Sequence, residues 1–384
     1  MKICIVSSSF YPATFYGGPI SATWDLSRKL AKNGVEVHVS TTNANGVEKL
    51  DVKTNEYIQK EGISVKYYSE QIINRFSLSF IFGIWSDIKK VDVVYIQYIF
   101  HYTVLFSLFF SVLLKKKIIL CPRGSFSRFT LSNRLPLIKS VWLSLFVKPF
   151  FRKIIWQASS YLEEEDIKRR FPNAKVEIIN DGIDFSSFQD FEVLSKEDVL
   201  IRYTSKKFKD ISSIFFSMGR LHEIKGFDVL IDAFSLYLKD DNNAKLIIAG
   251  NDDGVKSKLE NQISDLHIQE SVFLIGEVGF KDKKVLLNNC DYFTLASEFE
   301  SFGIVIAEAL SCGKPIALSN KTPWHDLEVN KCGILADNEK VSFFNAFTKI
   351  VNEKYDSKLI KNYVRSNYDW EVIVDRFIKI LKNK

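Results

Sequence analysis

The chain has 384 residues, 46% of them hydrophobic, and a formal net charge of +6. This length exceeds the size at which one hydrophobic core usually stops growing, so we expect two domains. The five cysteines are scattered and lack CxxC spacing, which argues against a disulfide framework or a zinc site. The first residues run straight into a strand-like segment with no export leader, so we expect a cytoplasmic protein with reduced thiols.

Positive charge is concentrated in one stretch. Between Val93 and Leu162 there is no Asp or Glu, although ten Lys and Arg residues lie there. Such asymmetry indicates an anionic partner surface, either lipid or nucleic acid. Within this stretch, basic residues alternate with aromatic ones, as in segments that lie at a membrane interface. The residues concerned are Arg128, Arg134, Lys139, Lys148, Arg152 and Lys153, with Phe126, Phe129, Trp142, Phe146, Phe150 and Phe151.

That segment predicts docking on an anionic membrane surface. The alternative is that the aromatic residues belong to the core and the cations form a solvated rim.

The first half of the chain alternates β-branched runs with helical stretches, the pattern of a parallel sheet wrapped by helices. The segment 20–34 predicts a helix that ends at Gly34, a residue type favoured just past a helix C-terminus. The predicted strands lie in 2–8, 35–42, 91–97, 117–124, 154–160 and 175–184.

The polar stretch 185–210 is predicted to be the linker region, and the second half then repeats the same pattern. A helix is predicted over 226–238 and an amphipathic helix over the C-terminal segment. We therefore predict an α/β protein of two doubly wound domains, residues 1–185 and 186–367, with a helix at about 368–384 that packs back on the first. Further strands are predicted in 213–220, 244–250, 271–276, 292–297 and 314–319.

The apolar segment 98–114 is about as long as the shortest membrane spans, but it contains His101 and lies between two strand-like runs. We expect a buried or surface-docking helix there.

Two carboxylates mark the strongest candidate site. Glu300 and Glu308 flank the start and middle of an otherwise apolar helix, where a buried carboxylate needs hydrogen-bond donors such as sugar or ribose hydroxyls. Gly303 lies at the entry of that helix, where free N–H groups and the helix dipole favour a phosphate. Without a ligand, Glu300 would be a solvated loop residue and Glu308 a partly exposed helical one.

Two cations precede the helix predicted over 226–238. Arg220 and Lys225 oppose its dipole unless an anion such as a diphosphate lies between them. Gly17 and Gly18 lie between the first strand and the first helix, where a parallel α/β domain binds its ligand, although a turn would also explain them.

Several segments, from GGP after the first strand through PRGSF, IINDGID, GRLHEIKG and LIIAG to ESFGIVIAEALSCGKP, resemble the family-4 glycosyltransferases. These are retaining enzymes of the GT-B fold, in which two Rossmann-like domains face a central cleft. The resemblance implies transfer of a hexose or N-acetylhexosamine from a UDP- or GDP-sugar to a glycan or lipid-linked acceptor. The expected setting is polysaccharide or lipopolysaccharide synthesis at the inner face of the cytoplasmic membrane.

The resemblance also implies roles for single residues. Arg220 and Lys225 would bind the donor diphosphate in place of a metal ion. Glu300 would hold hydroxyls of the transferred sugar, and Glu308 those of the ribose. Backbone groups of Phe302, Gly303 and Ile304 would line the sugar and phosphate pocket, while Gly17 and Gly18 would let the N-terminal loop approach the diphosphate.

One departure concerns a His-x-His motif that the family carries at the end of the strand in 91–97. Tyr95 and Gln97 occupy those positions here. Gln97 can hydrogen-bond a sugar hydroxyl but cannot carry a proton, and His101 is the possible substitute.

No metal site or separate cofactor is expected, because the chain has no Asp-x-Asp pair and its histidines are dispersed. The alternative functions are a sugar-nucleotide epimerase of the same fold and a non-catalytic nucleotide-sugar-binding protein. A third alternative is a nucleic-acid-binding protein. Because only the basic stretch suggests it and no other motif supports it, we expect no nucleic-acid partner.

Overall fold

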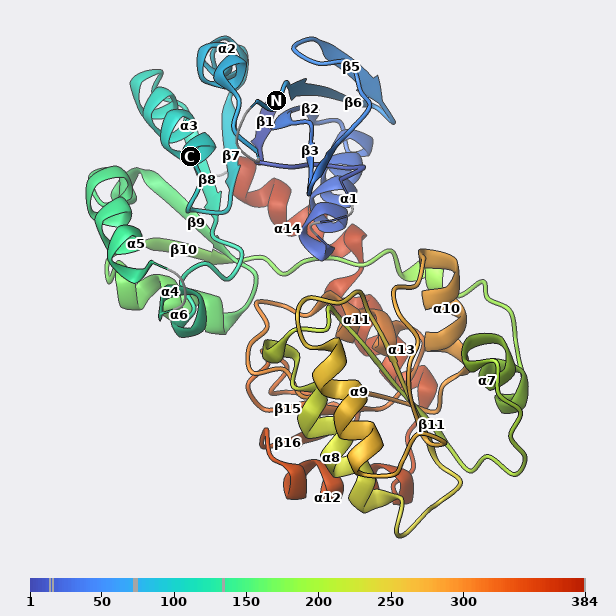
Figure 1. Ribbon diagram of the computed structural model, residues 1–384. Helices are drawn as coiled ribbons and strands as arrows, with labels where there is room; N and C mark the ends of the chain where they lie inside the picture. The colour runs from blue at the N-terminus through green and yellow to red at the C-terminus, as the bar shows by residue number, and fades with distance from the viewer. Residues whose placement is uncertain (14, 16, 72–74, 133–134, 383–384) are drawn as a thin grey trace. The chain divides into compact units, whose positions relative to one another are not determined.

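The protein folds into two units, each built around a mostly parallel sheet (Figure 1). The computed structural model describes residues 1–382 except 14, 16, 72–74 and 133–134. The first unit comprises Met1–Gly182 and Trp370–Lys384, and the second comprises Ile183–Asp369. The borders predicted from the sequence, after residue 185 and before residue 368, lie three and two residues from this division.

The first unit contains an eight-stranded sheet in the order β10-β9-β8-β7-β1-β2-β6-β5. Its strands pair in parallel except for the edge strand β5, which runs antiparallel to β6. The strands are β1 (Lys2–Val6), β2 (Glu36–Thr42), β5 (Tyr57–Lys60), β6 (Ile63–Tyr68), β7 (Val93–Gln97), β8 (Lys117–Cys121), β9 (Ile154–Ala158) and β10 (Lys175–Ile178), with a small hairpin of β3 (Ala44–Asn45) and β4 (Glu48–Lys49).

Alternation along these strands separates two apolar layers. Ile3 and Ile5 of β1 belong to one buried cluster, and Cys4 and Val6 belong to another. This is the period-2 pattern of a sheet that is covered on both faces. The helices of the unit are α1 (Gly18–Lys32), α2 (Leu78–Lys89), α3 (Tyr102–Leu113), α4 (Arg128–Ser132), α5 (Pro136–Trp142), η2 (Leu143–Val147), η3 (Phe151–Lys153), α6 (Tyr161–Arg170) and α14 (Trp370–Lys382).

The C-terminal helix α14 completes the core of the first unit. It packs against α1 and buries a full apolar face, and Figure 1 shows it in red beside the blue α1. At Gly182, any Cβ would lie 2.4 Å from the ring of Trp370, so a side chain there would displace the helix. The buried residues of α14 are Trp370, Ile373, Val374, Phe377, Ile380 and Leu381.

The apolar segment 98–114 forms the 12-residue helix α3, which packs against α2 and β7. His101 is its N-cap, with its Nδ1 3.4 Å from the backbone N–H of Thr103. Val104 and Leu108 are buried, while Phe109 and Leu113 are exposed. In the part of the chain that the structure describes, no helix is both long enough and apolar enough to span a bilayer.

The basic and aromatic segment 126–153 differs from the sequence expectation. Phe126 is buried, and Trp142, Phe146, Phe150 and Phe151 are half-buried, so most of these rings do not form an exposed surface. Phe126, Trp142, Phe150 and Phe151 pack into or against the apolar layer that covers one face of the sheet, and Phe146 packs against Trp142. Docking on an anionic membrane stays a prediction. Phe129 is exposed, and Arg134 lies outside the described residues. The other exposed apolar side chains here are aliphatic, namely Leu135, Leu137, Ile138, Val141 and Leu145.

The second unit contains a six-stranded parallel sheet in the order β13-β12-β11-β14-β15-β16. The strands are β11 (Ile214–Met218), β12 (Lys245–Ala249), β13 (Val272–Leu274), β14 (Tyr292–Leu295), β15 (Ile316–Ser319) and β16 (Gly333–Ala336). The helices are η4 (Phe185–Phe188), α7 (Lys196–Thr204), η5 (Glu223–Lys225), α8 (Phe227–Tyr237), α9 (Lys256–Asp265), α10 (Phe280–Asn289), α11 (Ile304–Ser311), α12 (Lys340–Asn352) and α13 (Ser357–Tyr368).

The segment 185–210 is not a linker. It contains η4 and α7, and Phe188, Val199 and Leu200 are buried in the core of the second unit. Ser195 caps α7, since its Oγ accepts a hydrogen bond from the backbone N–H of Asp198 at 3.1 Å. The polar composition of the exposed face concealed these few apolar positions.

Candidate active site

Two loops at the carboxyl edge of the second sheet bring the predicted donor-site residues together. They follow β11 and β14, which are neighbouring parallel strands, so both loops leave the sheet at the same edge. Their backbones touch: the N–H of Glu298 donates to the carbonyl of Ile224 at 2.8 Å. Gly226 has φ 63°, and a Cβ there would lie 2.1 Å from the carbonyl oxygen of Ala296. Only glycine permits this approach.

Lys225 and Glu300 form an ion pair across these loops. The Lys225 Nζ lies 2.5 Å from Glu300 Oε1, which also accepts the Ser297 hydroxyl at 2.9 Å. The side chains are 17% and 12% exposed, so solvent screens the pair only partly. The loop residue Glu300 is therefore held in place rather than freely solvated.

Arg220 lies in the same loop as Lys225 but has a different partner. It forms an ion pair with Asp253, in the loop that follows β12, and its side chain is 54% exposed. An exposed arginine can change partners at little cost, because a surface ion pair contributes little stability.

The helix α11 begins at Gly303, which has φ 80° and ψ 66°. A Cβ there would lie 2.6 Å from Ile306 Cδ1, so this left-handed turn favours glycine. No side chain caps the helix, and its first N–H groups form the positive end of the dipole. The buried residue Phe302 anchors the turn, because its carbonyl accepts the Trp324 indole N–H at 2.7 Å.

Glu308 lies on α11 and pairs with Lys283 of α10, with 2.5 Å between Nζ and Oε1. Glu308 is 9% and Lys283 17% exposed in their side chains. Lys283 lies in a KDKK run in which no lysine stands out, so its role is not apparent from the sequence. Lys225 and Lys283 thus donate hydrogen bonds to the two carboxylates, which were expected to receive them from ligand hydroxyls.

In the first unit, Gly17 and Gly18 lie where predicted, at the start of α1. Gly17 has φ 75° and ψ −152°, a backbone region that is essentially restricted to glycine. A Cβ there would meet no atom within 4 Å, so the backbone conformation rather than space requires glycine.

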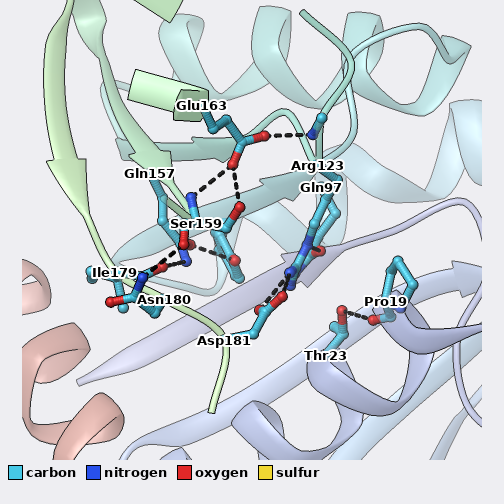
Figure 2. Close-up of polar contacts among 12 residues, drawn as sticks. Pro19, Thr23, Gln97, Arg123, Gln157, Ser159, Glu163, Ile179, Asn180 and Asp181 are labelled. Atoms are coloured by element: carbon cyan, nitrogen blue, oxygen red, sulfur yellow. Dashed lines mark hydrogen bonds and ion pairs between the residues drawn. The ribbon is translucent and has the colours of Figure 1, made fainter. Parts of the chain in front are cut away.

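Gln97 ends β7 and is only 1% exposed. Its Oε1 accepts the Nε–H of Arg123 at 2.9 Å. Arg123 Nη1 contacts both carboxylate oxygens of Asp181, at 2.5 and 2.7 Å (Figure 2). Tyr95, two residues before Gln97, belongs to the same apolar layer as Ile3 and Ile5, and its hydroxyl donates to Gln157 at 2.6 Å.

Glu163 fixes the loop that carries Arg123. One oxygen accepts the backbone N–H of Gly124 at 2.5 Å, and the other accepts the N–H and hydroxyl of Ser159, both at 2.7 Å (Figure 2). Burial raises the pKa of the Glu163 carboxyl, although these hydrogen bonds work in the opposite direction. No motif in the sequence singles out this carboxylate.

His101 has a structural explanation in its capping of α3. Burial, followed by the charge of Arg75, lowers its pKa to about 4, so the imidazole is neutral near pH 7. Its predicted role as a substitute for an active-site histidine stays a prediction.

No group of three or more His, Cys, Asp or Glu residues in the described ranges is arranged to hold a metal ion. The five cysteines are buried and unpaired, as the sequence predicted.

Two family models together match most of the chain. Residues 16–187 match the model described as Glycosyltransferase Family 4, and residues 204–370 match the one described as Glycosyl transferases group 1. The chain belongs to the family-4-type glycosyltransferases.

Solved structures agree with the predicted fold of this family member. The chain is similar to Anabaena HepE in complex with UDP and glucose, with a TM-score of 0.77, 18% identity and 99% of each chain covered. It is also similar to WaaG, a glycosyltransferase involved in lipopolysaccharide biosynthesis, with a TM-score of 0.69, 14% identity and 100% of each chain covered. Its two Rossmann-like units are those of the GT-B fold.

Among curated relatives, the chain is 27% identical over 236 residues to the uncharacterized glycosyltransferase MJ1607 of Methanocaldococcus jannaschii. The match covers 60% of this chain and 60% of that relative's length.

Proposed function

We propose that this family-4-type glycosyltransferase moves a hexose or N-acetylhexosamine, with retained configuration, from a UDP- or GDP-sugar to an acceptor. The observation that carries the proposal is the assembly of Lys225, Glu300 and the uncapped start of α11 at one edge of the second sheet. This arrangement offers cations and N–H groups to a diphosphate beside a carboxylate for hydroxyl groups. HepE, whose solved structure holds UDP and glucose, has the same fold.

Each charged side chain has capacity beyond its present partner. Lys225 carries three N–H donors, so it can contact a phosphate while it still holds Glu300. Lys225 contacts Oε1 of Glu300, and Lys283 contacts Oε1 of Glu308. The other carboxylate oxygen, Oε2, of each glutamate can accept a sugar or ribose hydroxyl. Backbone groups of Phe302, Gly303 and Ile304 complete the proposed pocket.

The proposed chemistry depends on leaving-group stabilisation. As the bond between sugar and diphosphate breaks, negative charge grows on the departing phosphate, where Arg220, Lys225 and the α11 dipole stabilise it. The acceptor attacks from the same face, and the leaving phosphate takes its proton. Retention follows, because the new bond forms on the face from which the old one departs.

Donor binding and transfer test this proposal. We expect one UDP- or GDP-sugar from a panel to raise the melting temperature, since a ligand that binds only the native state stabilises it. Sugar transfer should require an acceptor and should persist in EDTA, because Arg220 and Lys225 take the place of a metal ion. Conversion of the donor without any acceptor would instead identify an epimerase, and loss of activity in EDTA would contradict the leaving-group mechanism.

We also propose that the acceptor is a glycan or lipid-linked sugar of a cell-surface polysaccharide, reached from the inner face of the cytoplasmic membrane. The supporting surface is the aliphatic patch, defined as Leu135, Leu137, Ile138, Val141 and Leu145, each at least 55% exposed. The exposed cations Arg128, Lys148, Arg152 and Lys153 belong to the same segment. Aliphatic side chains enter the headgroup boundary while the cations meet acidic lipids.

Vesicle co-sedimentation tests the membrane proposal. Binding should rise with phosphatidylglycerol content and fall with salt, because each engaged cation contributes about 1 kcal/mol near an anionic surface. Changing Lys148, Arg152 and Lys153 together to Glu should abolish it. The same change to Glu at Lys53, Lys89 and Lys90, which are exposed elsewhere in the first unit, should leave most of the vesicle binding intact. Equal binding to neutral and anionic vesicles, or to neither, would contradict the proposal.

A further inference from the structure

Three buried polar atoms have no hydrogen-bond partner where β1 and β7 end. They are Gln97 Nε2 and the hydroxyl oxygens of Ser8 and Ser9, unpartnered among the residues that the structure describes. Each of these residues is 1% exposed. A buried polar group without a protein partner is costly unless water or a ligand supplies the missing hydrogen bond.

The sheet topology places the ends of β1 and β7 side by side. β1 pairs with β7 as far as Val6 and Ile96, and continuing the register by one residue places Ser7 beside Gln97. Ser8 and Ser9 follow Ser7 in the loop that leaves β1 at this same edge of the sheet. Chain order along the sheet reverses between β1 and β7, and ligands of open α/β sheets bind at such a switch point.

Arg123 determines which end of the Gln97 amide remains available. A guanidinium can only donate hydrogen bonds, so the group that faces Arg123 Nε at 2.9 Å must be the amide oxygen. The identity of the partner thus fixes an amide orientation that is otherwise ambiguous. The two N–H donors of Nε2 are the atoms left for a ligand.

Arg123 itself is held from two sides. Its guanidinium pairs with Asp181, and the side chains are only 4% and 13% exposed. Its backbone has φ 54°, a left-handed conformation that is strained for a residue with a side chain. The bond from Gly124 to Glu163 stabilises this turn, and strained backbone of this kind clusters at functional sites (Figure 2).

We propose that Arg123, held by Asp181, is a positioning residue that presents the Gln97 amide as a hydrogen-bond donor to a sugar oxygen. Ser8 and Ser9 belong to the same subsite and contribute hydroxyls. The ligand is a hydroxylated sugar with an oxygen acceptor at this point, and a group that can only donate is rejected. This inference rests on the proposed transferase function and deepens it.

Two variants separate positioning from folding. Gln97→Glu keeps a partner for Arg123 but removes the N–H donors, so kcat/KM should fall about tenfold, the equivalent of one hydrogen bond. Arg123→Met with Asp181→Asn removes both charges together, leaves no unpaired buried charge, and should cause a similar loss. The matched control is Lys66→Met with Asp87→Asn, another buried pair of the first unit, with 3.3 Å between Lys66 Nζ and Asp87 Oδ1. It should lower the melting temperature without a tenfold loss of kcat/KM.

Gln97→His gives a pH readout. A neutral imidazole accepts from Arg123 at one nitrogen and still presents an N–H at the other, so activity should persist near pH 8. Protonation removes that acceptor, so the variant should lose kcat/KM toward acid pH relative to the unmodified chain.

Side-chain NMR decides the orientation without any activity. The chain has only seven glutamines, so 15N-glutamine labelling yields few amide signals, and the one lost in Gln97→Glu belongs to Gln97. That signal should shift in the Arg123 and Asp181 double variant and stay in the Lys66 and Asp87 control. An unshifted signal, or wild-type kcat/KM in both Gln97→Glu and the double variant, would overturn the inference. An unmodified chain that transfers no sugar would instead count against the proposed function, and the NMR result would still decide the role of Arg123.

Discussion

Lys225→Ala should lower kcat by about 10²–10³-fold, the loss of roughly 2–4 kcal/mol seen when one preorganised charge-stabilising donor is removed. Arg220→Ala should have a comparable effect on kcat. The two variants should differ in stability. Removing Lys225 leaves the largely buried Glu300 without its cation, whereas Arg220 is 54% exposed and its pair with Asp253 is screened.

Steady-state kinetics at saturating donor, combined with thermal unfolding, measure both effects. Lys206→Ala is the control, because Lys206 pairs with Glu270 at 2.7 Å on the surface of the same unit. A folded Lys225→Ala variant with kcat within twofold of the control would remove Lys225 from the mechanism.

The second large effect concerns Glu308. Glu308→Ala alone would strand Lys283, which is 17% exposed, so we combine it with Lys283→Met. Hydrogen bonds to a charged group contribute about 1.5–3 kcal/mol, so the double variant should bind the donor roughly 10–100-fold more weakly.

Binding affinities of two ligands, measured by calorimetry, identify the part of the donor that Glu308 contacts. The free nucleoside diphosphate should lose affinity, but inorganic pyrophosphate, which lacks a ribose, should bind as it does to the unmodified chain. If both ligands weaken equally, Glu308 acts on the phosphate site or on folding, and its ribose assignment is wrong.

Local patterning predicts much of the fold. The continuous apolar run of β1 and the glycine after α1 mark elements that the structure contains. Prediction failed where a short element is mostly polar. The helix α7 was read as linker, because its buried positions, such as Val199 and Leu200, are few and separated from the rest of the core in sequence.

The candidate site shows the same limit. Arg220, Lys225, Glu300 and Glu308 lie in recognisable segments, so a sequence pattern can point to them. The contact between Arg123 and Asp181 joins residues 58 positions apart, and the pairing of Lys283 with Glu308 depends on how α10 and α11 pack. Neither contact is encoded in local spacing, since the first depends on the order of strands in a sheet and the second on the packing of two helices.

The course of the chain also bears on how the protein is made. Domains generally fold as units during synthesis, starting from the N-terminus. Here the first unit lacks six buried side chains of α14 until the last residues of its core have been translated. The second unit, which lies wholly within 183–369, is complete earlier. The unit that is translated first is therefore finished last, and until then the nascent chain exposes the apolar surface of α1 and its sheet that Trp370 and Phe377 later cover.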